Sequence, residues 1–206
     1  MDPVDRAERV RRGLHLEYFS LIWNVLETFV GMAAGIAAGS VALVGFALDS
    51  VVESSSAGVL IWRLRAEGSG ERDVEEIERR AVRLVAAAFW ALATYVGVKA
   101  GLDLVQQNRP EESPLGIVLA VVSLIVMPVL AARKRSAARD LDSRAMHADS
   151  SQTSLCTYIS AVLLFGLVAN ALLGWWWADP VAALGIAGLA GKEGHELWTT
   201  EDFCAH

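Results

Sequence analysis

Residues 18–62 read YFSLIWNVLETFVGMAAGIAAGSVALVGFALDSVVESSSAGVLIW, two apolar runs separated by little more than Gly39 and Ser40. Each run has about 20 residues, and an α-helix of that length, rising ~1.5 Å per residue, crosses about 30 Å of hydrocarbon. Glycine and serine between two such runs favour a turn. The stretch therefore predicts a hairpin of two membrane-spanning helices.

Four more apolar stretches follow this hairpin along the chain. Hydrophobic residues make up 54% of the 206-residue chain. This share exceeds that of ordinary soluble domains. We expect an all-α integral membrane protein whose six transmembrane helices lie near residues 18–38, 40–62, 81–98, 115–132, 146–173 and 176–189. As domains, we expect a cytoplasmic N-terminal arm (1–17), a transmembrane domain (18–191) and a cytoplasmic tail (192–206).

Positive charge gives the orientation. All but Lys99 and Arg109 of the 18 Lys and Arg residues fall in the N-terminal arm, around the connections after the second and fourth helices, or in the tail. Cytoplasmic segments carry such an excess. Both termini are therefore expected in the cytoplasm, in a multi-pass protein of the cell (inner or plasma) membrane. The net charge of −6 comes from short segments between apolar runs, and we expect no nucleic-acid partner.

Ionisable groups inside hydrocarbon cost several kcal/mol unless they face a partner or a cavity, so each one is a functional candidate. Asp49 and Glu53 are four residues apart and share one face of the second helix. On the fifth helix, Asp149, Gln152 and Cys156 follow the spacing i, i+3, i+7 and also share a face. Two helices therefore each present a polar stripe, and the first helix adds Glu27.

The polar residues of these helices can be compared by their depth in the membrane. At ~1.5 Å per residue from the cytoplasmic end of each helix, Glu53 lies ~13 Å deep and Cys156 ~15 Å deep. The same count gives ~13 Å for Glu27 and ~9 Å for Gln152. We therefore expect these groups to form one compact site near the middle of the bilayer if the helices pack together.

Carboxylates with a thiolate and an amide oxygen suit a divalent transition metal, and the sulfur favours softer ions such as Zn²⁺ and Cd²⁺. A buried thiol is also commonly a small packing group, so packing alone stays open for Cys156. The tail contains a second cluster, made of acidic, His and Cys residues. This cluster could bind metal, or the tail could be a solvated terminus. The candidate metal ligands are Asp49, Glu53, Gln152 and Cys156, with Glu27 and Asp149 as further candidates; the tail cluster is His195, Glu196, Glu201, Asp202, Cys204 and His206.

Three segments resemble the cation diffusion facilitator family of metal transporters: FALDSVVESSSAGVLIWRL (46–64), Ala148-Asp149, and WADPVAALGIA (177–187). The resemblance implies that Asp49 and Glu53 stand at ligand positions. It also implies that Gln152 stands where the family has a His and Cys156 where it has an Asp, which suggests a substrate unlike that of the typical member. It extends over about residues 15–198, so we expect a short form without the family's cytoplasmic C-terminal domain.

The resemblance implies a secondary transporter that exports a Zn²⁺- or Cd²⁺-like ion by alternating access, with the metal as substrate, no prosthetic group and no enzymatic activity. Protons are the natural counter-substrate, because metal binding displaces them from carboxyl and thiol groups. A homodimer surrounded by membrane lipid is expected. Two alternatives stay open: a membrane metal-binding or sensing protein that does not transport, and a thiol redox protein using Cys156 or Cys204, although no CxxC motif supports the latter.

Overall fold

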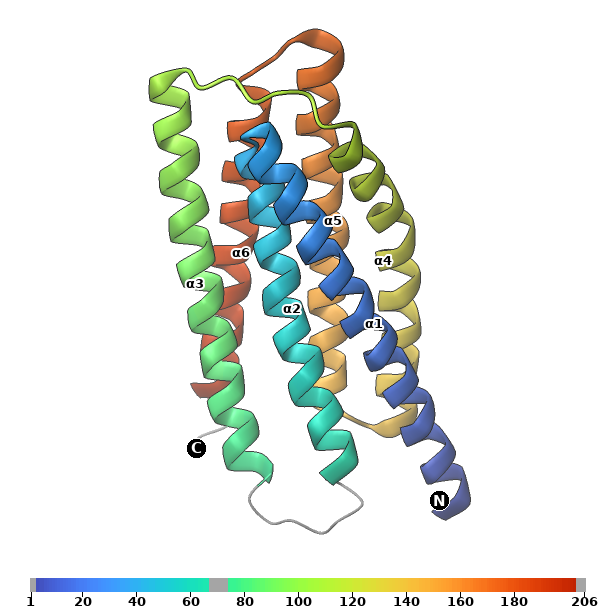
Figure 1. Cartoon of the computed structure of the whole chain (residues 1–206). Coiled ribbons are helices and arrows are strands. Elements are labelled where there is room, and N and C mark those ends of the chain that lie inside the picture. Colours follow the sequence, from blue (N-terminus) through green and yellow to red (C-terminus); the bar gives the residue numbers. More distant parts are fainter. Residues whose placement is uncertain (1–2, 67–73, 203–206) are drawn as a thin grey trace.

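The computed structural model describes residues 3–66 and 74–202, and over these residues the chain is helical without any strand. Six long helices run side by side in one bundle (Figure 1). Their bounds are α1 (Pro3–Ala38), α2 (Val41–Ala66), α3 (Val74–Gln106), α4 (Pro114–Leu141), α5 (Arg144–Leu173) and α6 (Ala178–Asp202). The expected all-α fold with six helices is confirmed.

Five of these helices, α1 to α5, are long and apolar enough to cross a membrane. Helix α6 is of similar length, but Lys192, Glu193 and Glu196 in its second half make it more polar. Several helices also extend beyond the expected spans. Residues 3–17 belong to α1, and residues 133–141, expected as a basic loop, form the last turns of α4. The chain is a multi-pass membrane protein.

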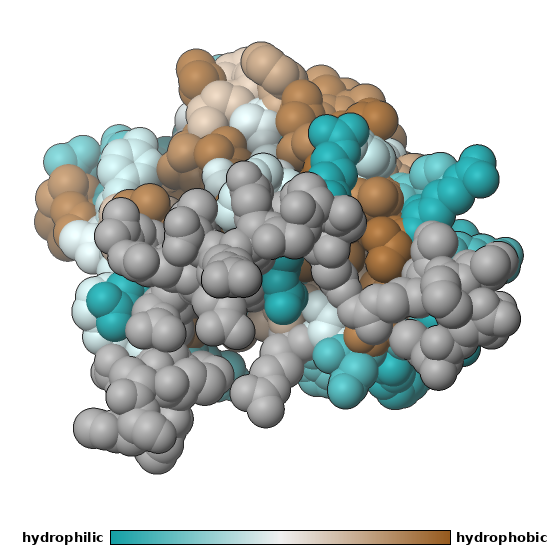
Figure 2. Space-filling view, turned by 90° about the horizontal axis from the view of Figure 1, so that it is seen from below, coloured by the Kyte–Doolittle hydropathy of each residue, from teal (hydrophilic) through white to brown (hydrophobic). Residues whose placement is uncertain are grey.

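Both ends of the chain lie at the same end of the bundle, together with the last turns of α2 and α4 and the first turns of α3 and α5 (Figure 1). Nearly all Lys and Arg residues belong to these segments. Viewed from this end, hydrophilic residues lie along the two sides and the lower edge, and hydrophobic residues gather toward the upper edge (Figure 2). The arrangement agrees with the expected cytoplasmic side, and we call this the cytoplasmic end.

Helix α2 has the most central position, because it packs against α1, α3, α5 and α6, while α5 packs against α2, α4 and α6. Small residues bring α1 and α2 close together. A Cβ atom at Gly35 would lie 2.9 Å from Val44 Cγ2, and one at Gly31 would lie 3.2 Å from Ala47 Cβ. Such small residues are typical of tightly packed membrane helices. The two expected polar stripes therefore lie on neighbouring, centrally placed helices.

At the opposite end of the bundle, Asp179 of α6 holds the start of α2. Its carboxylate accepts hydrogen bonds from Ser40 Oγ at 2.5 Å and from the backbone N–H of Val41 at 3.0 Å. These are groups that a helix N-terminus leaves unpaired. On α3, the Lys99 ammonium pairs with the Asp103 carboxylate at 2.5 Å, as the four-residue spacing predicts.

Candidate metal site

Asp49 and Glu53 lie one turn apart on α2 and are each 3% exposed. Glu53 accepts a hydrogen bond from Thr153 Oγ1 of α5 at 2.7 Å. The carboxylates are near enough for their charges to act on each other. The expected acidic face of the second helix is therefore turned inward, toward α5.

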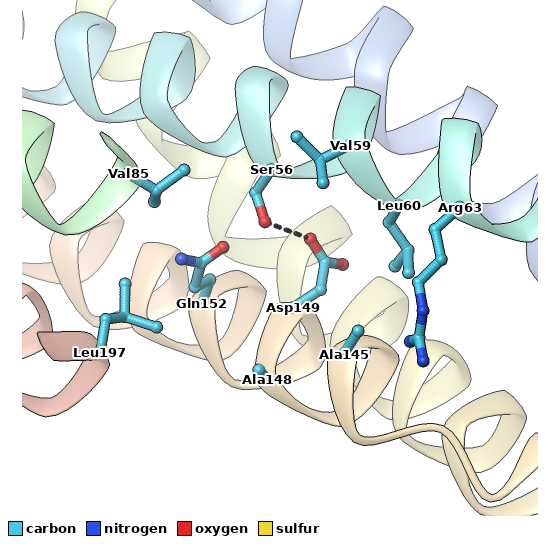
Figure 3. A pocket seen from close by; sticks show the side chains of 10 residues that line it. All are labelled: Ser56, Val59, Leu60, Arg63, Val85, Ala145, Ala148, Asp149, Gln152 and Leu197. Carbon is cyan, nitrogen blue, oxygen red and sulfur yellow. Dashed lines mark hydrogen bonds between the residues drawn. The ribbon is translucent and has the colours of Figure 1, made fainter. Parts of the chain in front are cut away.

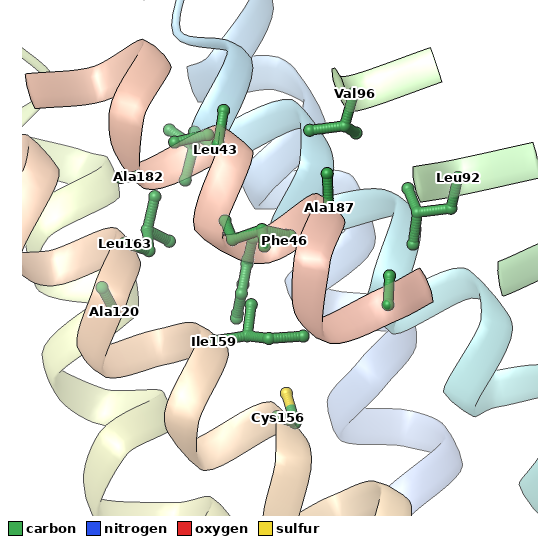
Figure 4. Close-up of a cluster of buried hydrophobic side chains, with 14 of the residues drawn as sticks. Leu43, Phe46, Leu92, Val96, Ala120, Cys156, Ile159, Leu163, Ala182 and Ala187 are labelled. Atoms are coloured by element: carbon green, nitrogen blue, oxygen red, sulfur yellow. The ribbon is translucent and has the colours of Figure 1, made fainter. Parts of the chain in front are cut away.

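Cys156 is on the face of α5 that is turned toward this pair. It lies three residues after Thr153, which donates to Glu53, and therefore shares the helical face of that contact. The side chain is fully buried, and Figure 4 shows its sulfur beside Ile159, in the same cluster of buried hydrophobic side chains as Phe46. Cys156 therefore lies where the acidic pair borders the apolar core, so this position suits both a ligand and a packing group.

Glu27 of α1 lies on the other side of the acidic pair. It is fully buried and accepts a hydrogen bond from Ser50 Oγ of α2 at 3.3 Å. Ser50 directly follows Asp49 in the sequence, so this contact places Glu27 against the same stretch of α2. Three carboxylates and one thiol from α1, α2 and α5 are thus buried in the interior of the bundle, and the single compact site that the depth count predicts stays a prediction.

Gln152 lies one turn closer to the cytoplasmic end than Cys156 and is 6% exposed. Its Oε1 atom has no hydrogen-bond partner. The side chain lines a cavity of about 60 Å³ whose wall also includes Asp149, Ser56 and Arg63 (Figure 3). Asp49 and Glu53 of α2 do not line this cavity, whereas Gln152 does, one turn along α5 from Cys156.

Asp149 has other partners. One of its oxygens accepts a hydrogen bond from Ser56 Oγ at 3.2 Å, and the other pairs with the Lys134 ammonium of α4 at 2.5 Å. Lys134 also pairs with Glu17 of α1 at 3.1 Å and donates to Ser20 Oγ at 2.9 Å. Asp149 is therefore part of a buried ion cluster rather than a carboxylate open to a metal.

Sequence reasoning missed Glu17 and Lys134, because both were counted with the solvent-exposed termini and loops. The helical spacing could have revealed them. Lys134 follows Met127 and Leu130 at intervals of three and four along the buried face of α4. Glu17 precedes the buried Ser20 and Asn24 on α1 at the same intervals of three and four. A charged residue that continues an apolar face is a candidate for burial even beyond the hydrophobic run.

The buried carboxylates and the thiol do not form a complete set of metal ligands. Across residues 3–66 and 74–202, no three His, Cys, Asp or Glu side chains are grouped closely enough to hold a metal ion. In the tail, Lys192 pairs with Glu196 at 3.3 Å. The side chains of Glu201 and Asp202, and all of Cys204 and His206, lie outside the described part, so the tail cluster stays a prediction.

The sequence profile of the cation efflux transmembrane domain matches residues 18–199 of the chain. The chain belongs to this family. It is 30% identical over 155 residues to an uncharacterized transporter of Synechocystis, covering 72% of this chain and 49% of the relative. It is also 30% identical over 97 residues to the cation-efflux pump FieF of Shewanella oneidensis, covering 47% of this chain and 32% of the pump.

A third relative is the magnetosome protein MamB of Magnetospira, which is 23% identical over 185 residues, covering 87% of this chain and 63% of MamB. The chain thus spans between about a third and two thirds of the length of these relatives. The family membership and the transmembrane location agree with the expectation from the sequence.

Proposed function

We propose that this protein is a membrane transporter that moves a divalent transition-metal ion out of the cytoplasm, with Zn²⁺ or Cd²⁺ as the preferred substrate. The observation that carries the proposal is the contact of Thr153 with Glu53, which puts the buried Asp49 and Glu53 of α2 against the face of α5 that bears Cys156. Membership of the cation efflux family supports it. Asp49, Glu53 and Cys156 are the proposed ligands, with Gln152 and Glu27 completing the shell.

The donor chemistry supports the choice of metal. Two carboxylates and one thiolate would carry a charge of about −3, which a divalent cation offsets more fully than a monovalent one. Thiolate sulfur bonds preferentially to soft ions, while carboxylate alone suits Mg²⁺, Ca²⁺ and Mn²⁺. Cys156 is therefore the residue that turns a general acidic site toward Zn²⁺ and Cd²⁺.

Proton exchange follows from the same groups. Carboxyl and thiol groups must lose protons before they bind a metal, so metal binding releases protons and proton binding releases metal. We propose that the site alternates between the two faces of the membrane, taking metal from the cytoplasm and protons from the other side. Because the ligand groups do not form a finished shell in this conformation, a shift of α5 relative to α2 would complete it.

The cavity beside Asp149 and Gln152 is the proposed route from the cytoplasm. It lies among α2, α3, α5 and α6 toward the cytoplasmic end, and the unpaired Oε1 of Gln152 could accept a partly hydrated cation there. An amide oxygen binds hard and borderline ions weakly and releases them readily. We therefore propose that Gln152 passes the ion onward to the acidic pair. The working unit is proposed to be a homodimer, as the family resemblance implies.

A pH gradient tests the transport proposal. We expect Zn²⁺ movement in proteoliposomes to accelerate when protons are more concentrated on the side toward which the metal moves, because protonation there expels the metal. Zn²⁺ flux is recorded with a metal dye, at zero gradient and at a gradient of about one pH unit, with protein-free liposomes as control. A rate that ignores the gradient would contradict proton exchange and favour a channel or uniporter.

A second candidate is a metal-binding or sensing protein that does not transport. The amide of Gln152 at the position where the family resemblance implies an imidazole favours it, because the strongest zinc ligand of that set is replaced. The same proteoliposomes distinguish the two functions. Saturable Zn²⁺ binding in detergent together with no flux at any gradient would favour the sensor.

A further inference from the structure

A groove of about 760 Å³ runs between α1 and α4 on the outside of the bundle, apart from the candidate metal site. Three basic side chains line it: Arg12 and His15 of α1 and Arg133 of α4. The rest of its wall is apolar and includes Phe19, Ile125 and Val129. These three apolar side chains are 51%, 65% and 52% exposed, so no other part of the described chain covers them.

The position of the groove along the membrane normal follows from one contact. Glu17 of α1 and Lys134 of α4 pair at 3.1 Å, which places these two residues at the same level. Counting ~1.5 Å per residue from that level, Arg12 lies ~8 Å and His15 ~3 Å toward the cytoplasm. On α4, Val129 lies ~8 Å and Ile125 ~14 Å toward the membrane interior. The groove is thus basic at its cytoplasmic end and apolar along its deeper part.

The Glu17–Lys134 level is also close to the boundary of the hydrocarbon. Helix α1 ends at Ala38 and α4 begins at Pro114, and about 20 residues from either point span ~30 Å of hydrocarbon. Both counts end within a residue or two of Glu17 and Lys134. Arg12 and His15 are therefore at the depth of lipid headgroups, and Arg133 reaches them by extending its long side chain toward the interface.

The two arginines retain binding capacity. Arg133 is exposed and has no protein partner within the described ranges. Arg12 is 63% exposed and meets Asp140 only at 4.0 Å. Guanidinium groups bind phosphate through two parallel hydrogen bonds, and basic pockets between membrane helices on the cytoplasmic side bind anionic headgroups.

We infer that this groove is a binding site for one anionic phospholipid of the cytoplasmic leaflet, with its phosphate between Arg12, His15 and Arg133 and an acyl chain along Phe19, Val129 and Ile125. The charge of the site selects the headgroup, and its apolar depth excludes a free phosphate ion as the preferred ligand. This inference does not depend on the transport proposal.

Lipid titration of the purified, delipidated chain in a neutral detergent, followed by native mass spectrometry, tests the inference. We expect phosphatidylglycerol to bind more tightly than phosphatidylcholine with the same acyl chains. Each interfacial cation contributes about 1 kcal/mol to binding of anionic lipid. The double variant Arg12→Gln/Arg133→Gln should therefore bind phosphatidylglycerol on the order of 30-fold more weakly.

Two comparisons make the result specific. The matched control Arg11→Gln/Arg139→Gln removes two exposed cations from the same two helices outside the groove, and it should bind phosphatidylglycerol like the parent. Val129→Trp fills the apolar part without changing charge, and it should weaken phosphatidylglycerol binding as well. Thermal unfolding of every variant checks that the chain remains folded.

Four outcomes would overturn the inference. The first is equal affinity for the two lipids, and the second is an equal loss in the control double variant. The third is occupation of the groove by a second copy of the chain, recognised by dimers that dissociate on Val129→Trp while lipid binding is unchanged. Binding of glycerol phosphate as tightly as the whole lipid would also contradict it, because the apolar part of the groove would then contribute nothing.

Discussion

Cys156 belongs to the buried hydrophobic cluster (Figure 4) and lies on the same face of α5 as Thr153, which donates to Glu53 of the acidic pair. A thiol there can pack, bind metal, or do both, and the two roles differ in how they respond to a change of metal. Sulfur gains much more from a soft ion than from a hard one, whereas a hydroxyl of similar shape prefers neither strongly. Metal selectivity therefore separates the roles better than activity does.

We predict that Cys156→Ser weakens Cd²⁺ and Zn²⁺ binding on the order of tenfold or more, while Mn²⁺ binding changes little. Calorimetric titration of parent and variant in the same detergent and buffer measures this difference. Losses that are equal for Cd²⁺ and Mn²⁺, or absent for both, would place Cys156 outside the ligand shell. The binding set would then be Asp49 and Glu53 with Gln152 or Glu27.

Lys134 is fully buried and neutralises part of the acidic interior, since it contacts Glu17 and Asp149 directly. Removing one partner of a buried ion pair leaves an uncompensated charge and costs about 3–5 kcal/mol. Replacing both partners by neutral groups of similar size is often close to neutral. The ion cluster therefore leads to a prediction about the free energy of unfolding that does not depend on any metal.

We predict that Lys134→Met lowers the free energy of unfolding by about 3 kcal/mol or more, and that adding Asp149→Asn recovers much of this loss. Unfolding in mixed micelles gives both values. Arg139→Met is the matched control, because it removes an exposed cation from the same helix and should have little effect. Additive losses in the double variant would show that Lys134 and Asp149 are not energetically coupled.

These residues show which features of the candidate site can be predicted from the sequence. The four-residue spacing of Asp49 and Glu53 and the depth of Cys156 were enough to predict that these side chains turn inward, since spacing fixes a face and depth fixes a level, and all three are buried. The ion pair of Asp149 was not predictable, because its partner Lys134 comes from α4 and the pair depends on how α4 and α5 pack. Only the structure gives that packing.

At the scale of the helices, hydropathy predicted their number and order but not their full length. Apolar composition marks only the part of a helix within hydrocarbon, while α1 and α4 continue past it and bury Glu17 and Lys134 there. The loop expected after the fourth span is therefore helix up to Leu141. The turn between α4 and α5 is only two residues, Asp142 and Ser143.

Asp179 links two helices that are far apart in sequence, since its carboxylate accepts hydrogen bonds from Ser40 and from the first turn of α2. Hydrogen bonds to a charged group contribute about 1.5–3 kcal/mol, and a buried donor that loses its acceptor adds to the cost. Because α2 carries Asp49 and Glu53, this contact also fixes the position of the acidic pair relative to α6.

We predict that Asp179→Asn lowers the free energy of unfolding by about 1–3 kcal/mol. The exchange keeps the shape of the side chain but removes its charge and one acceptor. Glu112→Gln removes a charge from an exposed position at the same end of the bundle and serves as the control. Unchanged stability of Asp179→Asn would mean that the packing of α2 against α6 does not need this contact.

At the scale of the whole molecule, the candidate site lies on α2, which packs against four other helices, and on its neighbour α5, while α1 and α4 supply Glu17 and Lys134 of the buried ion cluster beside it. The cytoplasmic end holds the basic residues and both ends of the chain (Figure 1). This arrangement places acidic groups in the interior and positive charge at one face. It agrees with the positive-inside rule and with a cation pathway through α2 and α5.

The most direct test of the central claim is Zn²⁺ flux into proteoliposomes under a fixed pH gradient, comparing the parent with Asp49→Asn, Glu53→Gln and the control Glu112→Gln. The account predicts that the first two variants fall to the rate of protein-free liposomes because each loses a charged ligand, while the control keeps the parent rate. Variants that reconstitute and unfold like the parent exclude a folding defect. Parent-like flux in both Asp49→Asn and Glu53→Gln would contradict a metal site between α2 and α5.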